Sequence, residues 1–223
     1  MNYFWINLLI IAGPLALSFD SRVAYFRRWP AVFLTILVVG FFYVAWDVQA
    51  TRRGDWSFNP KYLVGVRYLG LPLEEILFFF TVPFSCIFIL ECVKAYLPQY
   101  GLPFSLYLYL VPTVVFAALA WLYRRRSYTF RVFWVTGLFF ALAALVGRET
   151  VSSSHFWIAL LITYIPFVIF NGFLTGLPVV IYTPRAVLGT RITTIPLEDF
   201  FYSFAMLGFY FLAFSVIRPW VGL

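Results

Sequence analysis

The chain carries the stretch NPKYLVGVRYLGLPLEEILFFF at residues 59–80 and a near copy, TPRAVLGTRITTIPLEDFFYSF, at residues 183–204. A shift of 124 residues aligns the two copies without a gap. The matches include proline, glycine, arginine and acidic positions, which coincide by chance far less easily than apolar positions do in so hydrophobic a chain. The two copies indicate an internal repeat, whose period sets the organisation of the whole chain.

The composition is typical of an integral membrane protein. Of the 223 residues, 63% are hydrophobic and 11% are charged, and the mean hydropathy is +0.91. Such a chain cannot hide its apolar side chains in a water-soluble core. A helix that crosses the bilayer needs about 20 mainly apolar residues, and seven stretches are candidates for such a helix. They are residues 3–19, 31–49, 73–97, 104–123, 130–147, 156–182 and 195–217.

The repeat divides these helices into three, one and three. We expect a first three-helix repeat at residues 1–97, a joining helix within 98–124, and a second three-helix repeat at 125–223. Four helices separate equivalent positions, so both repeats have the same orientation in the membrane, related by a pseudo-twofold axis along its normal. The predicted fold is an all-α integral membrane protein with seven transmembrane helices in two parallel repeats. Both acidic motifs then open on the same side of the bilayer.

Two adjacent acids stand at the start of a helix in each copy: Glu74 and Glu75 in the first, and Glu198 and Asp199 in the second. One interpretation is structural, because a proline at the first helical position followed by acids complements the helix dipole. The other is functional. A carboxylate close to hydrocarbon is costly and usually faces a cavity, and two neighbouring acids in such a site cannot easily both ionise. The duplication favours the functional interpretation.

Aromatic rings follow both motifs, with Phe78 after the first and Tyr202 after the second. Ring faces attract cations, so rings around the acids would suit a pocket that protects a carbocation from water. The simpler interpretation is that most of these rings face lipid or one another. Asp47, which follows Trp46, lies opposite Asn171 at the repeat offset. We expect these residues to line the pocket and bind substrate, although an interfacial helix end would also explain Asp47.

The basic residues give the chain a net charge of +7 and gather in short stretches such as YFRRW and YRRRS between the apolar segments. In a membrane protein these predict contact with phospholipid head groups and not with nucleic acid. Arg67 and Arg191, each seven residues before the first acid of a motif, are further candidates for substrate binding. They would hold the charge state of the acids, or they bind head groups. The distribution of basic residues leaves the membrane orientation open.

Several kinds of chemistry lose support because their motifs are missing from the sequence. It contains no G-x-G-x-x-G, no P-loop, no H-E-x-x-H, no histidine cluster and no D-x-x-x-D pair for a magnesium-bound diphosphate. We therefore expect no cofactor and no metal. Acid-base chemistry on an apolar substrate remains.

The segments PLEEILFF and PLEDFFY, each opening a helix after an arginine segment, resemble the small membrane lycopene cyclases. These occur as two-subunit bacterial enzymes, as fused single chains, and as the cyclase part of fungal bifunctional phytoene synthase and lycopene cyclase proteins. The resemblance implies a lycopene β-cyclase of carotenoid biosynthesis that acts on lycopene or a related acyclic carotenoid. It assigns catalytic roles to Glu74, Glu75, Glu198 and Asp199. It also implies a multi-pass enzyme of the cell membrane, active as a single chain; the oligomeric state stays open.

The second motif departs from the first in carrying Asp199 in place of a glutamate, so the two halves need not be equally competent. A small-solute transporter is the main alternative, because three-one-three parallel repeats are also a carrier layout; Asn171 and residues 172–178 favour it most. A retinal protein needs a lysine within the membrane, whereas Lys61 lies in a loop and Lys94 near a helix end.

Overall fold

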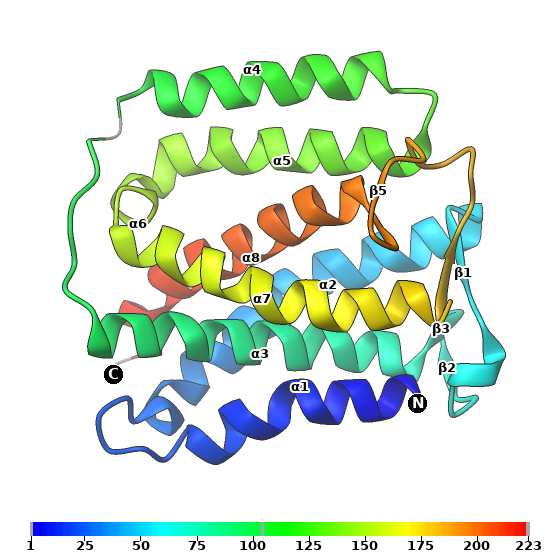
Figure 1. Cartoon of the computed structure of the whole chain (residues 1–223). Coiled ribbons are helices and arrows are strands. Elements are labelled where there is room, and N and C mark those ends of the chain that lie inside the picture. The colour runs from blue at the N-terminus through cyan, green and yellow to red at the C-terminus, as the bar shows by residue number, and fades with distance from the viewer. Residues whose placement is uncertain (1, 104, 222–223) are drawn as a thin grey trace.

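The computed structural model describes residues 2–103 and 105–221, most of them in helices that lie side by side in one bundle (Figure 1). The α-helices are α1 (Tyr3–Leu17), α2 (Trp29–Arg53), α3 (Leu73–Tyr96), α4 (Tyr107–Leu122), α5 (Ser127–Val146), α6 (Arg148–Val151), α7 (Ser154–Gly176) and α8 (Leu197–Ile217). Short 3-10 helices lie at η1 (Tyr25–Arg28), η2 (Pro60–Tyr62) and η3 (Arg218–Val221). The strands are β1 (Trp56–Phe58), β2 (Arg67–Tyr68), β3 (Leu71–Pro72), β4 (Val180–Tyr182), β5 (Arg191–Ile192) and β6 (Ile195–Pro196).

The protein is all-helical, and its surface is that of a membrane protein. Among the described residues, 5 helices are long and apolar enough to cross a bilayer, namely η1–α2, α3, α5, α7 and α8–η3. Large apolar side chains point outward from them: Leu37 is 70% exposed and Phe41 69% exposed. The helices α1 and α4 are apolar but shorter. Each of the seven predicted stretches contains one helix, whereas the count of seven membrane spans stays a prediction.

Two of the predicted helices extend too far, into residues that form strands, whereas the other predicted boundaries differ by up to four residues. The stretch 156–182 was predicted to be one helix, but α7 ends at Gly176 and residues 180–182 form β4. Pro178 explains the stop, because proline cannot continue a helix and keeps the residue before it out of the helical region. Residues 195–196 form β6, so α8 begins only at Leu197. The predicted limits at residues 1, 104 and 223 lie outside the described residues.

The strands gather at the end of the bundle where α3 and α8 begin (Figure 1). In the first hairpin Arg67 pairs with Pro72, and in the second Arg191 pairs with Pro196, so that the register is the same at an offset of 124 residues. The strands β1 and β4 pair antiparallel about Ser57 and Ile181, which are also 124 residues apart. The two acidic motifs thus open at one end of the molecule.

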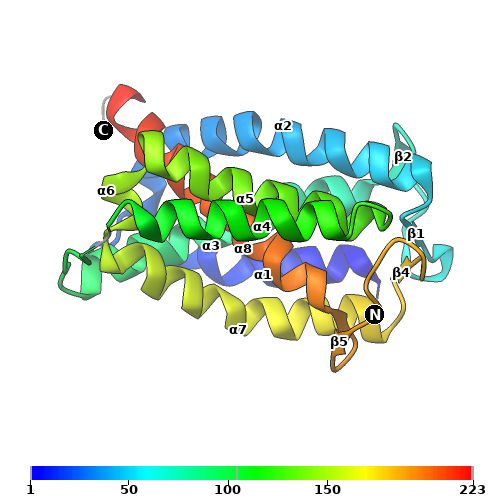
Figure 2. The same ribbon diagram turned by 90° about the horizontal axis from the view of Figure 1, so that it is seen from above.

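The helices that carry the acids, α3 and α8, lie inside the bundle. The helix α1 packs on α3 as α5 packs on α8, and α7 packs on α3 as α2 packs on α8. Figure 1 shows α4 on the opposite side of the bundle from α1, and Figure 2, the view from above, shows α4 in front of α5 and α8. Gly208 allows α8 to approach α5, because a Cβ there would lie 2.7 Å from the ring of Phe139. The helices α3 and α8 also contact each other directly.

Candidate active site

The first acid of each motif ties its hairpin to its helix. Glu74 is fully buried and its Oε1 accepts a hydrogen bond from the backbone N–H of Val64 at 2.5 Å. Glu198 is fully buried too, and its Oε1 accepts from the N–H of Leu188 at 2.5 Å. Glu198 also accepts from the hydroxyl of Thr129 at 2.6 Å. These hydrogen bonds fix the chain that precedes each hairpin to the start of the following helix.

The prolines of the motifs stand one residue earlier than predicted. Pro72 and Pro196 occupy the N-cap positions, as the last residues of β3 and β6, and are not the first residues of the helices. Both pairs of acids lie in the first helical turn. The structural interpretation therefore holds in part for the position of the acids, but it does not explain where the second acid of each pair points.

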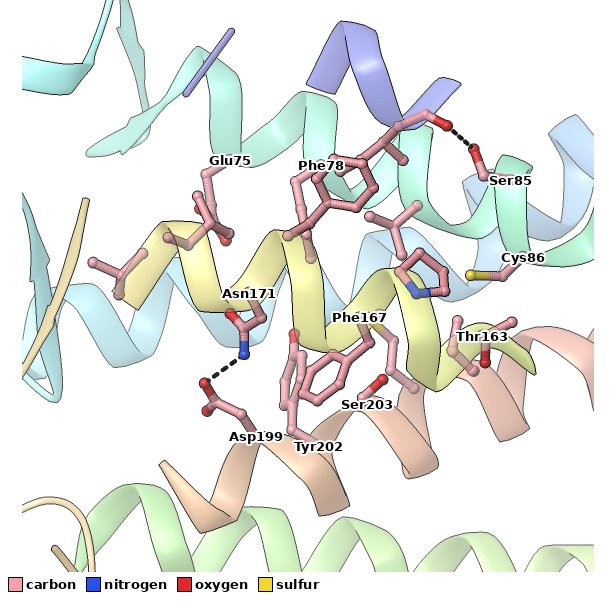
Figure 3. Close-up of a pocket in the computed structure, with 18 of the residues that line it drawn as sticks. Glu75, Phe78, Ser85, Cys86, Thr163, Phe167, Asn171, Asp199, Tyr202 and Ser203 are labelled. Atoms are coloured by element: carbon pink, nitrogen blue, oxygen red, sulfur yellow. Dashed lines mark hydrogen bonds between the residues drawn. The ribbon is translucent and has the colours of Figure 1, made fainter. Parts of the chain in front are cut away.

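The second acids, Glu75 and Asp199, both line one cavity of about 270 Å³. Figure 3 shows Glu75 extending from α3 and Asp199 from α8, with Asn171 of α7 between them. A successive residue on a helix points about 100° away from its neighbour, since there are 3.6 residues per turn. This rotation turns Glu75 and Asp199 towards the cavity while Glu74 and Glu198 face the hairpins.

The cavity is long, narrow and mainly apolar. Its lining on α3 runs along one helix face from Glu75 to Ile89, a length of roughly 21 Å at 1.5 Å per residue. The strand pair β1–β4 lines the cavity at the acid end, and Cys86 and Thr163 lie towards the other end (Figure 3). A cavity of this size lies just below the usual range for small-molecule sites, about 300 to 1,000 Å³. Its shape suits an extended apolar chain.

Asp199 is held by three hydrogen-bond donors. Its Oδ1 accepts from the hydroxyl of Tyr128 at 2.7 Å, and its Oδ2 accepts from the hydroxyl of Tyr182 at 2.8 Å and from Nδ2 of Asn171 at 3.0 Å. Burial and the nearby charge of Asp199 raise the pKa of the Tyr182 phenol well above its ordinary range, so this hydroxyl keeps its proton and remains a donor. Three donors stabilise the negative charge of a carboxylate.

Glu75 has different surroundings. Its Oε2 accepts one hydrogen bond, from the hydroxyl of Tyr3 at 2.9 Å. Asp47 of α2 is 4% exposed and lines the same cavity. Its Oδ2 is buried and has no hydrogen-bond partner among the described residues. The half of the site around Glu75 therefore contains a second carboxyl group where the half around Asp199 contains an amide.

The sequence model of the lycopene cyclase family matches the chain in two segments, residues 1–93 and 125–217. The two segments begin 124 residues apart, and the first contains Asp47, Glu74 and Glu75 while the second contains Asn171, Glu198 and Asp199. The chain belongs to the lycopene cyclase family. No curated protein and no solved structure matches it significantly.

Membership of this family makes the protein an enzyme of carotenoid biosynthesis with a carotenoid substrate in a membrane. The apolar exterior and the narrow apolar cavity agree with a substrate that is drawn from lipid. The comparisons give no support to a small-solute transporter.

Six of the residues that the sequence singles out line the cavity of this cyclase: Asp47, Glu75, Phe78, Asn171, Asp199 and Tyr202. The others lie outside its lining. Trp46 packs against the ring of Tyr202, with 5.4 Å between the centroids. The side chains of Arg67 and Arg191 are exposed and bond to their own hairpin turns, through the carbonyl oxygens of Gly70 and Thr194. No ion pair with the four motif acids is found for either arginine among the described residues.

The sequence did not reveal three tyrosines that reach the acids, Tyr3, Tyr128 and Tyr182. Tyr3 and Tyr128 play matched parts in the two halves, one bonded to Glu75 and the other to Asp199. They are 125 residues apart and not 124, so the ungapped alignment that exposes the acids misses them. Among the described residues no group of three or more His, Cys, Asp or Glu side chains is placed to hold a metal ion.

Proposed function

We propose that the chain is a lycopene β-cyclase, which converts linear end groups of lycopene to β-ionone rings by acid-base catalysis without net oxidation or reduction. Formally this is an isomerisation by an intramolecular lyase. The observation that carries the proposal is that Glu75 and Asp199, from the two halves of the chain, line one narrow apolar cavity. The reaction needs one proton to be given and one to be taken at the same end group.

The chemistry proceeds in three steps. A carboxylic acid protonates the terminal double bond of the end group, which leaves a carbocation. A second double bond of the polyene attacks this cation and closes the six-membered ring, and a carboxylate then removes a proton from a ring carbon. One C–H bond forms and one breaks, so the product is an isomer of the substrate. Proton transfer by positioned groups typically contributes about 100- to 10,000-fold to a rate.

The walls of the cavity suit the cation. The rings of Phe78, Phe167 and Tyr202 line it beside the acids (Figure 3). Aromatic faces stabilise a nearby positive charge, and the apolar lining keeps out water that would trap the cation. A channel of roughly 21 Å along α3 would hold the polyene extended, with its end group at Glu75 and Asp199.

The architecture in this proposal is that of two parallel three-helix repeats, residues 1–97 and 125–223, joined through α4. The identical hairpin registers and the matched segments of the family model support it. The active site is then composite, since each repeat supplies one cavity-facing acid, and a single chain suffices for activity. We expect seven spans and insertion in the cell membrane.

Expression of the gene in a lycopene-accumulating bacterium tests the function. We expect chromatography of the pigments to show carotenoids with β-ionone rings. Retention of lycopene alone, from protein that is well inserted in the membrane, would contradict the proposal. The variant Glu75→Gln, produced at the same level, is the control that ties the conversion to this cavity.

A further inference from the structure

Asp47 and Asn171 stand at equivalent positions of α2 and α7, 124 residues apart, and both line the cavity. An aspartate and an asparagine have nearly the same shape but opposite hydrogen-bonding capacity at one atom. The amide nitrogen of asparagine only donates, whereas the carboxyl group of aspartate accepts when it is charged and donates when it is protonated. The presence of Asp47 in one half and Asn171 in the other is the main chemical difference between the two halves of the site.

On one side, the amide favours a charged Asp199. Asn171 donates from Nδ2 to Oδ2 of Asp199 at 3.0 Å, and the hydroxyls of Tyr128 and Tyr182 supply two more donors. Both oxygens of Asp199 accept, and hydrogen bonds to the charged form of a carboxyl group favour that form. The surroundings of Asp199 are those of a base.

On the other side, Asp47 favours a protonated Glu75. Asp47 and Glu75 are both buried and line the same cavity. No lysine, arginine or histidine lines the cavity among the residues that the structure describes. Two neighbouring carboxyl groups in an apolar site, with no cation to compensate them, cannot easily both be charged, so the resting pair holds one proton.

We propose that Asp47 and Glu75 form an acid pair that shares one proton, from which Glu75 protonates the substrate, while Asp199 is the base that receives the ring proton. The inference rests on the proposed cyclase function and names the roles within it. The buried Oδ2 of Asp47, without a partner among the described residues, is the atom at which the shared proton can reside. Asp47 is a positioning residue for the proton, and Glu75 is the catalytic acid.

The proton balance closes over one turnover. The O–H bond of Glu75 breaks as the C–H bond at the end group forms, and a ring C–H bond breaks as Asp199 takes up its proton. The site is then left with a charged Asp47–Glu75 pair and a protonated Asp199. Release of that proton to the solvent and uptake of one proton by the pair between turnovers restore the starting state, so no oxidant, reductant or co-reactant is needed.

The titratable groups around Glu75 are Tyr3 of α1, Asp47 of α2, Tyr182 of β4, and Asp199 and Tyr202 of α8, with Glu74 next to it on α3. The helix α7, which also packs on α3, contributes the neutral Asn171 to the cavity. The tyrosines are neutral donors, so Asp47 and Asp199 are the charges that can alter the protonation of Glu75 from other elements. This permits a test by exchange of single residues.

The experiment measures the cyclisation rate of purified protein in liposomes across a range of pH for Asp47→Asn and Asn171→Asp. In Asp47→Asn an amide donor replaces the partner carboxyl group, so Glu75 loses its proton at lower pH. We expect the alkaline limb of the pH profile to move to lower pH, with the rate at neutral pH reduced by about tenfold for each unit of the move. In Asn171→Asp the base loses an amide donor, so the acid limb should move to higher pH.

The outcome that overturns the inference is an alkaline limb of Asp47→Asn that coincides with that of the wild type, or a shift of the same limb in both variants. Asp47→Glu keeps a carboxyl group and should leave the alkaline limb in place. If Asp47→Asn does not accumulate, the pH profile of Asp47→Glu is compared with that of Asn171→Asp. A wild-type protein that cyclises nothing at any pH contradicts the proposed function instead, so that the two failures are distinguishable.

Discussion

Glu74 and Glu75 are neighbours in the chain but lie in different regions of the molecule, and the same holds for Glu198 and Asp199. Glu74 and Glu198 face the hairpins and accept hydrogen bonds from backbone N–H groups. Glu75 and Asp199 face the cavity and accept from tyrosine hydroxyls. The difference shows that an acidic pair at a helix start can be divided by the helical rotation into a residue that holds the fold and a residue that is free for chemistry.

The largest effect is expected for Glu75→Gln. The amide keeps the shape of the side chain but cannot give a proton, so we expect the cyclisation rate to fall by about 100- to 10,000-fold. Pigment analysis in lycopene-accumulating cells, normalised to the amount of inserted protein, measures it. A rate close to that of the wild type would remove Glu75 from the chemistry and with it the contrast between the two acids.

Glu198→Ala should chiefly affect stability. The change leaves the N–H of Leu188 and the buried hydroxyl of Thr129 without their acceptor, which costs roughly 1 to 3 kcal/mol. Thermal unfolding of the detergent-solubilised protein should show this loss, while the molecules that remain folded should keep a rate within several-fold of the wild type. A large loss of rate at unchanged stability would place Glu198 among the catalytic groups.

Glu74→Ala should act in the same direction and less strongly. The carboxylate of Glu74 accepts from Val64 at 2.5 Å, whereas that of Glu198 accepts from both Leu188 and Thr129. We expect a loss of about 1 kcal/mol in unfolding free energy, measured side by side with Glu198→Ala. The comparison fails if Glu74→Ala is the more destabilised of the two.

Tyr182→Phe removes one of the three donors to Asp199. The hydroxyl of Tyr128 and the amide of Asn171 remain, and one hydrogen bond is worth about 0.5 to 1.5 kcal/mol. We expect the rate of cyclisation to fall by no more than about tenfold, as measured with the purified protein. An inactive variant would indicate that Tyr182 itself handles a proton.

The smallest effect is expected for Arg67→Gln. The guanidinium is exposed and bonds to the carbonyl oxygen of Gly70 in its own hairpin turn, and surface substitutions of this kind usually change stability by less than about 0.5 kcal/mol. The pigment yield should match that of the wild type. A marked loss would restore the sequence-based expectation that Arg67 binds substrate or controls the acids.

Much of this site follows from the sequence, because acids, prolines and glycines that recur at one offset survive as a pattern in a hydrophobic chain. The offset of 124 residues paired Asp47 with Asn171 and predicted that the motifs open together. It could not predict which acid faces the cavity, since that depends on the helical rotation and on whether the proline stands before or within the first turn. The repeat did not predict the matched roles of Tyr3 and Tyr128, because these residues are 125 positions apart and not 124.

The sequence pattern did not predict the β4 strand, for a different reason. Its residues, Val180–Tyr182, are as apolar as the helix before them, so hydropathy alone extends that helix through Pro178. The strand forms because it pairs with β1, whose residues lie more than 120 positions earlier, and such long-range pairing is invisible in a local pattern. Tyr182 reaches Asp199 from this strand.

Cyclisation of lycopene by the purified protein in heavy water tests the central claim most directly. Carboxyl protons exchange with the solvent, so protonation of the substrate by Glu75 should place one deuterium in every ring that forms, detected as a mass increase of the product. The Glu75→Gln variant should form no labelled rings above background. Rings that form without deuterium would contradict protonation by an exchangeable group of the protein, and with it the acid-base account of the cavity.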